Sequence, residues 1–400
     1  MNTPKRLFCR SFQTVLHIAL PILPYRSPKV LTSVADVPGC LKEKKLASVL
    51  IVTNGFLHIS GMLEPLKKAL QESGIRYTIY DEVTPNPTVL NVELARERYI
   101  AENCQALIGF GGGSAIDCAK AVGARIARPN KTIPQMRGIL KVMKPIPYLI
   151  AVPTTAGTGS ETTLATVITD HNTSHKFPVN DFPLIPRVAV LDPEMTRSLP
   201  PHMTSTTGMD ALTHAVEAYI GGSTTRQTRR DALEAARLIA ENLETAYADG
   251  NNMTARANML RAAFLAGGAF SKSYVGYCHA VAHSLGGQYH IPHGLANAVL
   301  LPYVLEAYGE SAHKKCKDIA VAMHLANADT PAHQAAAALI AEIRRMNAAM
   351  NIPAKLPGIR EADIPKLTAY ADKEANPLYP VPKLMDAKEL ERFYYDVMEA

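Results

Sequence analysis

Short apolar strand patterns alternate with helical patterns through the first half of the chain. Helical patterns at 61–72 and 89–102 separate the early strand patterns. This alternation is typical of parallel strands, because each parallel strand needs a crossover connection before the next one. We therefore predict an α/β domain with a doubly wound sheet over residues 1–198. Its predicted strands lie at 49–53, 77–80, 106–110, 148–152, 165–168 and 188–191.

The second half of the chain has no strand pattern after the break at Leu199-Pro200-Pro201. Alanine-rich segments such as 231–248 and 254–266 take over, with apolar residues at helical spacing. A chain of 400 residues also exceeds the size at which one core usually keeps growing. We predict a second, all-helical domain over residues 199–400.

Bulk properties exclude several classes of protein. The six cysteines include no Cys-x-x-Cys pair, which argues against a disulfide framework and favours the cytoplasm. The net charge of +6 is small and its basic residues are dispersed, so no nucleic-acid partner is expected. The apolar run 15–23 contains His17 and Pro21, and no segment is long enough to span a membrane. We interpret this run as a segment that packs on the first domain.

A glycine-rich turn follows the strand pattern at 106–110. Three glycines, Gly111 to Gly113, let the backbone approach a ligand, and Ser114 is a candidate N-cap with Asp117 three residues later as in a capping box. Amide groups at such a helix start attract a pyrophosphate. Ile116 breaks the Gly-x-Gly-x-x-Gly fingerprint, and a tight turn without a ligand explains the loop equally well.

A second loop, rich in hydroxyl groups, follows the strand pattern at 148–152. Its threonines Thr154, Thr155 and Thr158 would lie at the carboxyl edge of the sheet, where doubly wound sheets bind ligands. Alone, such a loop is more often simply solvated. Two such loops at successive strand ends favour a dinucleotide-binding domain.

Carboxylate and imidazole side chains in the second half have the spacing of metal ligands. Two pairs are four residues apart and so share a helix face, and a fifth residue follows a proline break. Nitrogen and oxygen donors suit iron(II) or zinc(II), which polarise a hydroxyl or carbonyl oxygen. The alternative is a carboxylate at a helix N-terminus and satisfied core histidines, and spacing alone leaves open which histidines would bind. The residues are Asp210, His214, His279, His283 and His293.

From about residue 28 to residue 398 the chain resembles the iron-containing (group III) alcohol dehydrogenases. This resemblance implies a dinucleotide-binding N-terminal domain, an all-helical C-terminal domain in a dehydroquinate synthase-like fold, and a divalent metal in the cleft. The motifs that carry it are Pro85-Asn86-Pro87, Gly111 to Lys120, Pro153 to Thr158, Gly208 to His214, and His279 to Asn297.

The resemblance also implies roles for individual residues. The metal ligands would be Asp210, His214, His279 and His293, with Fe²⁺ expected and Zn²⁺ the alternative. The cofactor would contact residues near the adenosine, at the pyrophosphate and beyond the strand at 165–168. These residues are Asn54, Asn86, Gly112, Gly113, Ser114, Asp117, Thr154, Thr155, Thr158 and Lys176.

Two further residues are expected beside the substrate. His283 takes the place of a histidine that does not bind the metal, and it is the candidate catalytic residue, as a proton relay. Phe270 would shape the substrate pocket, although helix core explains it nearly as well. His290 lies in an alternating segment and is expected to be dispensable.

One position departs from the family pattern. The first strand ends in Val52-Thr53-Asn54, where members that prefer NAD commonly have Asp. Asn keeps the hydrogen bonding to the ribose but does not repel a 2′-phosphate. NAD is therefore the expected cofactor, and NADP remains the alternative.

Together these features predict a metal-dependent, NAD(P)-linked alcohol dehydrogenase that interconverts a primary alcohol or diol and its aldehyde. At least a homodimer is expected from the resemblance. A lyase or cyclase of the dehydroquinate synthase type would need several basic residues to hold an acidic substrate. The segment 271–294 offers only Lys272, so this alternative is weaker.

Overall fold

The computed structural model describes residues 1–170 and 175–399 and divides into two compact units. One unit spans residues 24–199. The other combines residues 1–23 with residues 200–400. The division near residue 200 falls at the proline break where strand patterns end in the sequence.

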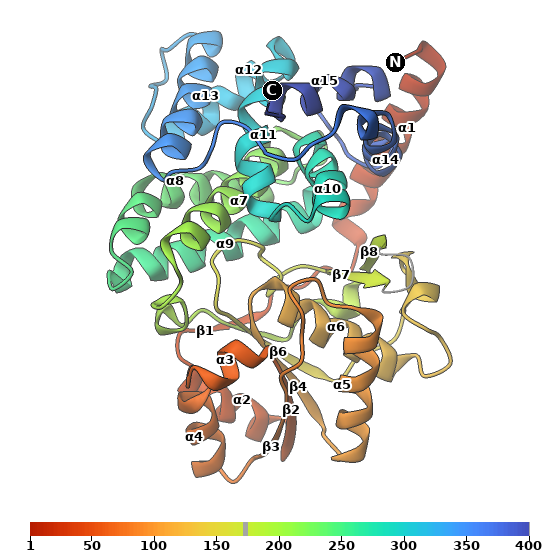
Figure 1. Cartoon of the computed structure of the whole chain (residues 1–400), viewed down its shortest axis with the longest axis vertical. Helices are drawn as coiled ribbons and strands as arrows, with labels where there is room; N and C mark the ends of the chain where they lie inside the picture. The colour runs from red at the N-terminus through yellow and green to blue at the C-terminus, as the bar shows by residue number, and fades with distance from the viewer. Residues whose placement is uncertain (171–174, 400) are drawn as a thin grey trace. The chain divides into compact units, whose positions relative to one another are not determined.

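The first unit contains a six-stranded parallel sheet (Figure 1). Its strand order is β1-β9-β6-β4-β2-β3, and every neighbouring pair is parallel. The prediction of a doubly wound α/β fold is confirmed, and the predicted strands of this sheet match within a few residues. The strands are β1 (Lys29–Leu31), β2 (Ser48–Val52), β3 (Arg76–Tyr80), β4 (Ala106–Gly111), β6 (Tyr148–Pro153) and β9 (Val188–Val190).

Helices cover both faces of this sheet because its central strands are apolar on both sides. Val49 and Ile51 of β2 pack in one core with α2 and α4, whereas Leu50 and Val52 pack in another with α5 and α6 (Figure 1). Alternate residues of one strand therefore belong to different cores. The helices are α2 (Val37–Glu43), α3 (Gly55–Ile59), α4 (Glu64–Glu72), α5 (Val89–Ala101) and α6 (Gly113–Ala127).

The strand order reverses between β2 and β4. From β2 the chain moves outward to β3 and then returns to β4 on the other side of β2. In an open parallel sheet, the carboxyl ends of two strands that flank such a reversal form a crevice for ligands. Asn54 follows β2 and Gly112 follows β4, so two predicted cofactor residues border this crevice.

One predicted strand lies outside the parallel sheet. β7 (Ala165–Asp170) pairs antiparallel with β8 (His175–Asn180), and β8 pairs with the short β5 (Gly138–Ile139). Burial along β7 alternates, with Thr166 and Ile168 buried and Val167 exposed. A strand with one buried face fits a small surface sheet, and its inclusion in the doubly wound sheet was wrong.

The second unit is helical, in agreement with the predicted all-helical domain. Within the described residues, no helix is both long and apolar enough to cross a membrane. Its helices are α1 (Thr3–Ala19), α7 (Pro201–Ile220), α8 (Arg226–Ala248), α9 (Met253–Ser273), α10 (Tyr277–Tyr289), α11 (His293–Tyr308), α12 (Glu310–Ala322), α13 (Ala332–Ala349), α14 (Ile364–Ala375) and α15 (Ala387–Val397).

The N-terminal helix α1 groups with the helical unit, which differs from the prediction of one domain over residues 1–198. Gln13 is buried, and its amide donates to the backbone carbonyls of Pro377 and Tyr379 at 3.1 and 2.7 Å. Arg10 donates to the carbonyl of Val381 at 2.8 Å, and Lys5 pairs with Asp372 at 2.8 Å. These polar contacts attach α1 to α14 and the loop after it (Figure 1).

We expect Gln13→Ala to lower the free energy of unfolding of the helical unit by about 1–3 kcal/mol, because the hydrogen bonds to the partly buried carbonyl of Pro377 and the buried carbonyl of Tyr379 are lost. Thermal unfolding followed by circular dichroism measures this change. Ser11→Ala is the matched control, since Ser11 lies exposed on the same helix. Equal unfolding temperatures for the two variants would contradict the proposed role of Gln13.

Candidate functional site

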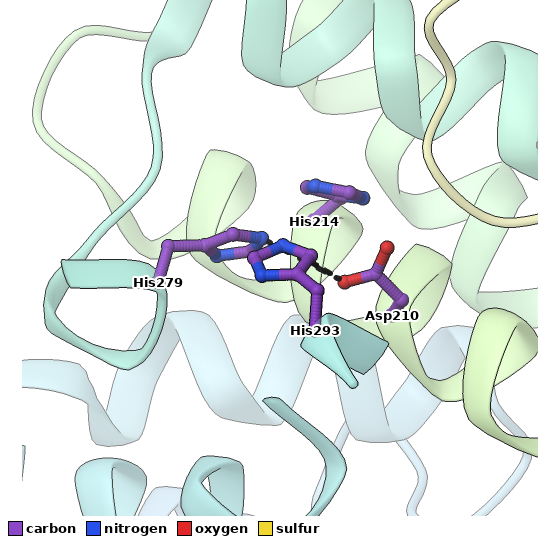
Figure 2. Close-up of side chains that lie close together, drawn as sticks. All are labelled: Asp210, His214, His279 and His293. Carbon is purple, nitrogen blue, oxygen red and sulfur yellow. Dashed lines mark ion pairs between the residues drawn. The ribbon is translucent and has the colours of Figure 1, made fainter. Parts of the chain in front are cut away.

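Four side chains from three helices meet in the helical unit (Figure 2). Asp210 and His214 lie on α7, His279 lies on α10, and His293 is the first residue of α11. Each offers one potential ligand atom, and these atoms all lie within 4.8 Å of one another. Figure 2 shows the three imidazole rings and the carboxylate turned toward a common centre. We refer to these four residues as the donor cluster.

The donor cluster is largely buried. Asp210, His214 and His279 are at most 4% exposed, and the side chain of His293 is 37% exposed. Nε2 of His279 and Nε2 of His293 lie 3.9 and 3.5 Å from Oδ1 of Asp210. The cluster therefore combines one carboxylate oxygen with imidazole nitrogens, the donor types that divalent iron and zinc accept.

His279 has the electrostatic state that a metal ligand requires. Burial holds the pKa of its imidazole well below the usual value, and the neighbouring histidines lower it further. The neutral ring thus presents a lone pair, as metal binding demands. Nε2 of His279 is buried without a hydrogen-bond partner among the described residues. A buried polar atom of this kind is costly unless something binds it, and a cation would satisfy it.

The positions of Asp210 and Gly294 in their helices explain how the donors meet. Asp210 lies in the middle of α7, so it is not the carboxylate at a helix N-terminus that the sequence left as an alternative. Gly294 allows α11 to begin beside α7, because a Cβ at this residue would lie 2.3 Å from the carbonyl oxygen of Thr206. A larger residue at 294 would push His293 away from Asp210.

Two neighbouring side chains support the donor cluster, and sequence reasoning missed both roles. Nδ1 of His279 lies 2.6 Å from Oε2 of the buried Glu217, whose pKa burial raises to about 7. The amide of Asn297 donates to Oδ1 of Asp210 at 2.7 Å. Asp210, His214 and Glu217 follow helical spacing, so the sequence held a signal for Glu217. Asn297 ended a motif that was recognised without a role for this residue.

His283 and Phe270 lie beside the donor cluster. The ring of His283 stacks on that of His293 with centroids 5.0 Å apart, and its Nδ1 lies 2.6 Å from Oε1 of Glu374. Phe270 stacks on His214 with centroids 4.2 Å apart. Both predicted substrate-side residues therefore touch predicted metal ligands. His290 ends α10 in a left-handed conformation and is not part of the donor cluster.

In the α/β unit, the start of α6 differs from the predicted capping box. Gly112, with an extended backbone, is the N-cap, and Ser114 lies inside the helix and donates to the carbonyl of Pro85. The carboxylate of Asp117 accepts from the hydroxyl of Ser160 at 2.6 Å and from the amide of Val167 at 2.8 Å. The capping box was therefore wrong, because Asp117 holds the following loop and β7 in place.

The two predicted phosphate loops pack against each other. The amide of Thr154 donates to the carbonyl of Gly111 at 3.0 Å. A Cβ at Gly113 would lie 2.9 Å from Cγ2 of Thr158, so only glycine permits this approach. The buried Lys120 donates to Thr163 and Ala165, and burial lowers its pKa to about 8. The ends of β4 and β6 thus form one continuous surface that includes Thr155.

The remaining predicted cofactor residues, Asn54, Asn86 and Lys176, lie on three different segments. Asn54 caps α3, with its side-chain oxygen accepting from the amide of Leu57 at 2.9 Å. Asn86 lies between Pro85, which contacts Ser114, and Pro87, whose carbonyl accepts from the amide of Thr169 at 2.8 Å. Lys176 pairs with Thr169 across β7 and β8, and burial lowers its pKa. Among these residues, Asn86 is thus next to a residue that contacts the start of α6.

Family models match both units. Residues 31–193 match the model described as iron-containing alcohol dehydrogenase. Residues 204–398 match the model described as the C-terminal part of the iron-containing alcohol dehydrogenase family. The first match contains the two predicted phosphate loops, and the second contains the donor cluster.

Individual relatives are similar along nearly their whole length. The 1,3-propanediol dehydrogenase of Citrobacter freundii is 37% identical over 378 residues, which cover 94% of this chain and 97% of that protein. A solved 1,3-propanediol oxidoreductase superimposes with a TM-score of 0.89 at 36% identity, covering 93% and 98% of the two chains. The sulfoacetaldehyde reductase of Bifidobacterium kashiwanohense, solved in complex with NAD⁺, superimposes with a TM-score of 0.82 at 27% identity, covering 93% and 97%.

We expect Gly294→Ala to weaken the binding of a divalent metal to the donor cluster by about 10- to 100-fold, because the added methyl group separates α11 from α7. Competition with a chromogenic chelator measures the affinity. Gly287→Ala is the control, since a Cβ at Gly287 meets no atom within 4 Å. Equal metal affinities for these two variants would show that the spacing of the two helices does not matter.

Proposed function

The chain belongs to the iron-containing alcohol dehydrogenases, and we propose that it interconverts a primary alcohol or diol and its aldehyde with NAD and a divalent metal. As a member of this family it is an oxidoreductase that acts on CH–OH groups. The observation that carries the proposal is the donor cluster, one carboxylate and three imidazoles converging in a buried place.

Asp210, His214, His279 and His293 are proposed to hold the metal, with Fe²⁺ expected and Zn²⁺ as the alternative. The low pKa of His279 and its buried Nε2 support this assignment. When bound, the metal would supply a Lewis acid for the substrate oxygen, and the nicotinamide would supply hydride chemistry at the substrate carbon. The remaining steps belong to side chains of this chain.

His283 is proposed to move the proton of the substrate hydroxyl. Its Nδ1 faces Oε1 of Glu374, which also accepts from the hydroxyl of the buried Tyr379 at 2.7 Å. A carboxylate accepts this hydrogen bond, so Nδ1 carries the ring hydrogen and Nε2 takes the proton. Phe270, stacked on His214, is proposed to form an apolar wall of the substrate site.

The dinucleotide is proposed to bind at the crevice between the carboxyl ends of β2 and β4. Gly112, Gly113 and Ser114 would meet the pyrophosphate at the start of α6, where amide groups favour anions. Thr154, Thr155, Thr158 and Lys176 would contact the rest of the cofactor, and Asn54 and Asn86 the adenosine. Asp117 is proposed to act indirectly, since its carboxylate already accepts from Ser160 and Val167.

A diol is included in the substrate class because two similar proteins are named for 1,3-propanediol. They are the dehydrogenase of Citrobacter freundii and the solved 1,3-propanediol oxidoreductase. NAD is placed before NADP because a similar solved protein holds NAD⁺. The cytoplasmic location and the homodimer rest on the cysteine content and the family resemblance, and they stay predictions.

The proposed function is tested by activity of the purified protein loaded with Fe²⁺ or Zn²⁺. We expect it to reduce NAD with ethanol or 1,3-propanediol, as followed by absorbance of the reduced cofactor. Removal of the metal should abolish activity, and His279→Ala should lower it by about 100-fold. His290→Asn should retain activity, because Asn tolerates the left-handed conformation at this residue. No turnover of any alcohol, diol or aldehyde by the loaded protein would contradict the proposal.

We expect Asn54→Asp to shift the ratio of kcat/KM for NAD over NADP toward NAD by about tenfold, because a carboxylate repels the 2′-phosphate. Asp is also a good N-cap, so the cap of α3 should persist. Steady-state kinetics with both cofactors measure the ratio. Asn86→Asp provides a comparison of the same ratio, since Asn86 is expected near the adenosine but does not lie at the end of β2. An unchanged ratio in Asn54→Asp would place selectivity elsewhere.

A further inference from the structure

Glu217 joins the two helices that carry most of the donor cluster. It lies on α7 with Asp210 and His214, and its side chain is 1% exposed. Both carboxylate oxygens point to α10: Oε2 lies 2.6 Å from Nδ1 of His279, and the backbone amides of Gly276 and Cys278 donate to Oε2 and Oε1 at 2.8 Å each. One buried carboxylate thus accepts three hydrogen bonds from the beginning of α10.

These contacts act as an N-cap supplied by another helix. The first amides of an α-helix have no partner inside the helix, and they are usually bound by the side chain of the preceding residue. Gly276 precedes α10 and has no side chain that could do so. Glu217 therefore fixes where α10 begins relative to α7. It thereby also fixes the position of His279 relative to Asp210.

Gly276 leaves the space that this arrangement needs. A Cβ at residue 276 would lie 2.7 Å from Oε1 of Glu217 and 3.3 Å from the hydroxyl of Tyr308. The carboxylate is thus enclosed between α7, the start of α10 and Tyr308 of α11. Its position leaves little freedom for the imidazole of His279.

The ring orientation of His279 follows from this enclosure. A carboxylate that already accepts two amides can only accept from Nδ1, so Nδ1 carries the ring hydrogen. Nε2 is then unprotonated and turned toward Asp210, His214 and His293. Carboxylate partners that fix a ligating histidine in this way typically change metal affinity by about 10- to 100-fold.

We infer that Glu217 is a positioning residue that sets the tautomer and the place of His279 and thereby the affinity of the donor cluster for a divalent metal. The inference rests on the proposed metal site. It goes beyond that proposal because Glu217, which lies outside the donor cluster, is assigned the control of metal affinity.

The tautomer of His279 can be measured in the unaltered protein. In metal-free protein with ¹⁵N-labelled histidine, NMR at about pH 9, where Glu217 is ionised, should show Nδ1 of His279 protonated and Nε2 unprotonated. The loss of its resonances in His279→Gln assigns them. A hydrogen on Nε2 would overturn the inference, and this measurement requires no change to Glu217.

The effect on affinity is measured with Co²⁺ as the probe. Glu217→Gln retains the size of the side chain but offers one oxygen to three donors, so we expect Co²⁺ to bind about 10- to 100-fold more weakly and its visible absorption spectrum to change. Glu306→Gln is the matched control, because Glu306 lies on α11 and pairs with Arg344 at the surface. The control should bind Co²⁺ as the unaltered protein does. Unaltered affinity and spectrum in Glu217→Gln would overturn the inference.

Binding of NADH, followed by its fluorescence, shows whether the α/β unit of each variant is intact, and circular dichroism reports the helical unit. If Glu217→Gln does not fold, the tautomer of His279 decides the question. Failure of the inference and failure of the proposed function are distinguishable. If Glu217→Gln weakens Co²⁺ binding but the unaltered protein oxidises no alcohol, only the proposed function is contradicted. If the unaltered protein is an active enzyme but Glu217→Gln binds Co²⁺ with unchanged affinity, only the inference is contradicted.

Discussion

The packing of α10 and α11 against α7 is the constraint on which the donor cluster depends. Metal ligands from separate helices must converge within tenths of an ångström, so the register between these helices matters more than the stability of any one of them. Two glycines permit the approach, Gly294 beside Thr206 and Gly276 beside Glu217. The hydrogen bond that Glu217 accepts from His279 and the one that Asn297 donates to Asp210 then hold the donors in place. These buried hydrogen bonds fix the positions of the donor atoms as well as stabilising the packing of the three helices.

In the α/β unit, several residues predicted to bind the cofactor also support the fold. Glycines at the start of α6 allow Thr155 and Thr158 to approach closely, while Asp117 and Lys120 of the same helix bind the following loop. Burial of Lys120 is costly, and three oxygen acceptors compensate for it. The motif Gly111 to Lys120, predicted to contact the cofactor, thus also fixes the position of the following loop through hydrogen bonds.

Periodicity and turn residues sufficed to predict the sheet and the helical second half, because these features depend on local spacing. Spacing also gave five candidate metal ligands, but only the family resemblance separated His283 from the four donors that the structure brings together. Contacts between distant segments could not be predicted this way. Ser114 was expected to cap α6, yet Gly112 does, since an extended glycine can occupy that place without a side-chain bond. β7 was placed in the main sheet because its apolar pattern resembles that of a buried strand. Glu374 gave no signal, as only the fold brings it to His283.

The placement of α1 has a consequence for the order of folding. The segment from β1 to β9 is continuous, and its first strand pairs with its last, so the α/β unit can close once the chain through residue 199 has left the ribosome. The helical unit is discontinuous, because α1 binds groups between residues 372 and 382. Domains generally fold as units during synthesis. The first helix of this chain must therefore wait for nearly the last, while a complete domain forms between them.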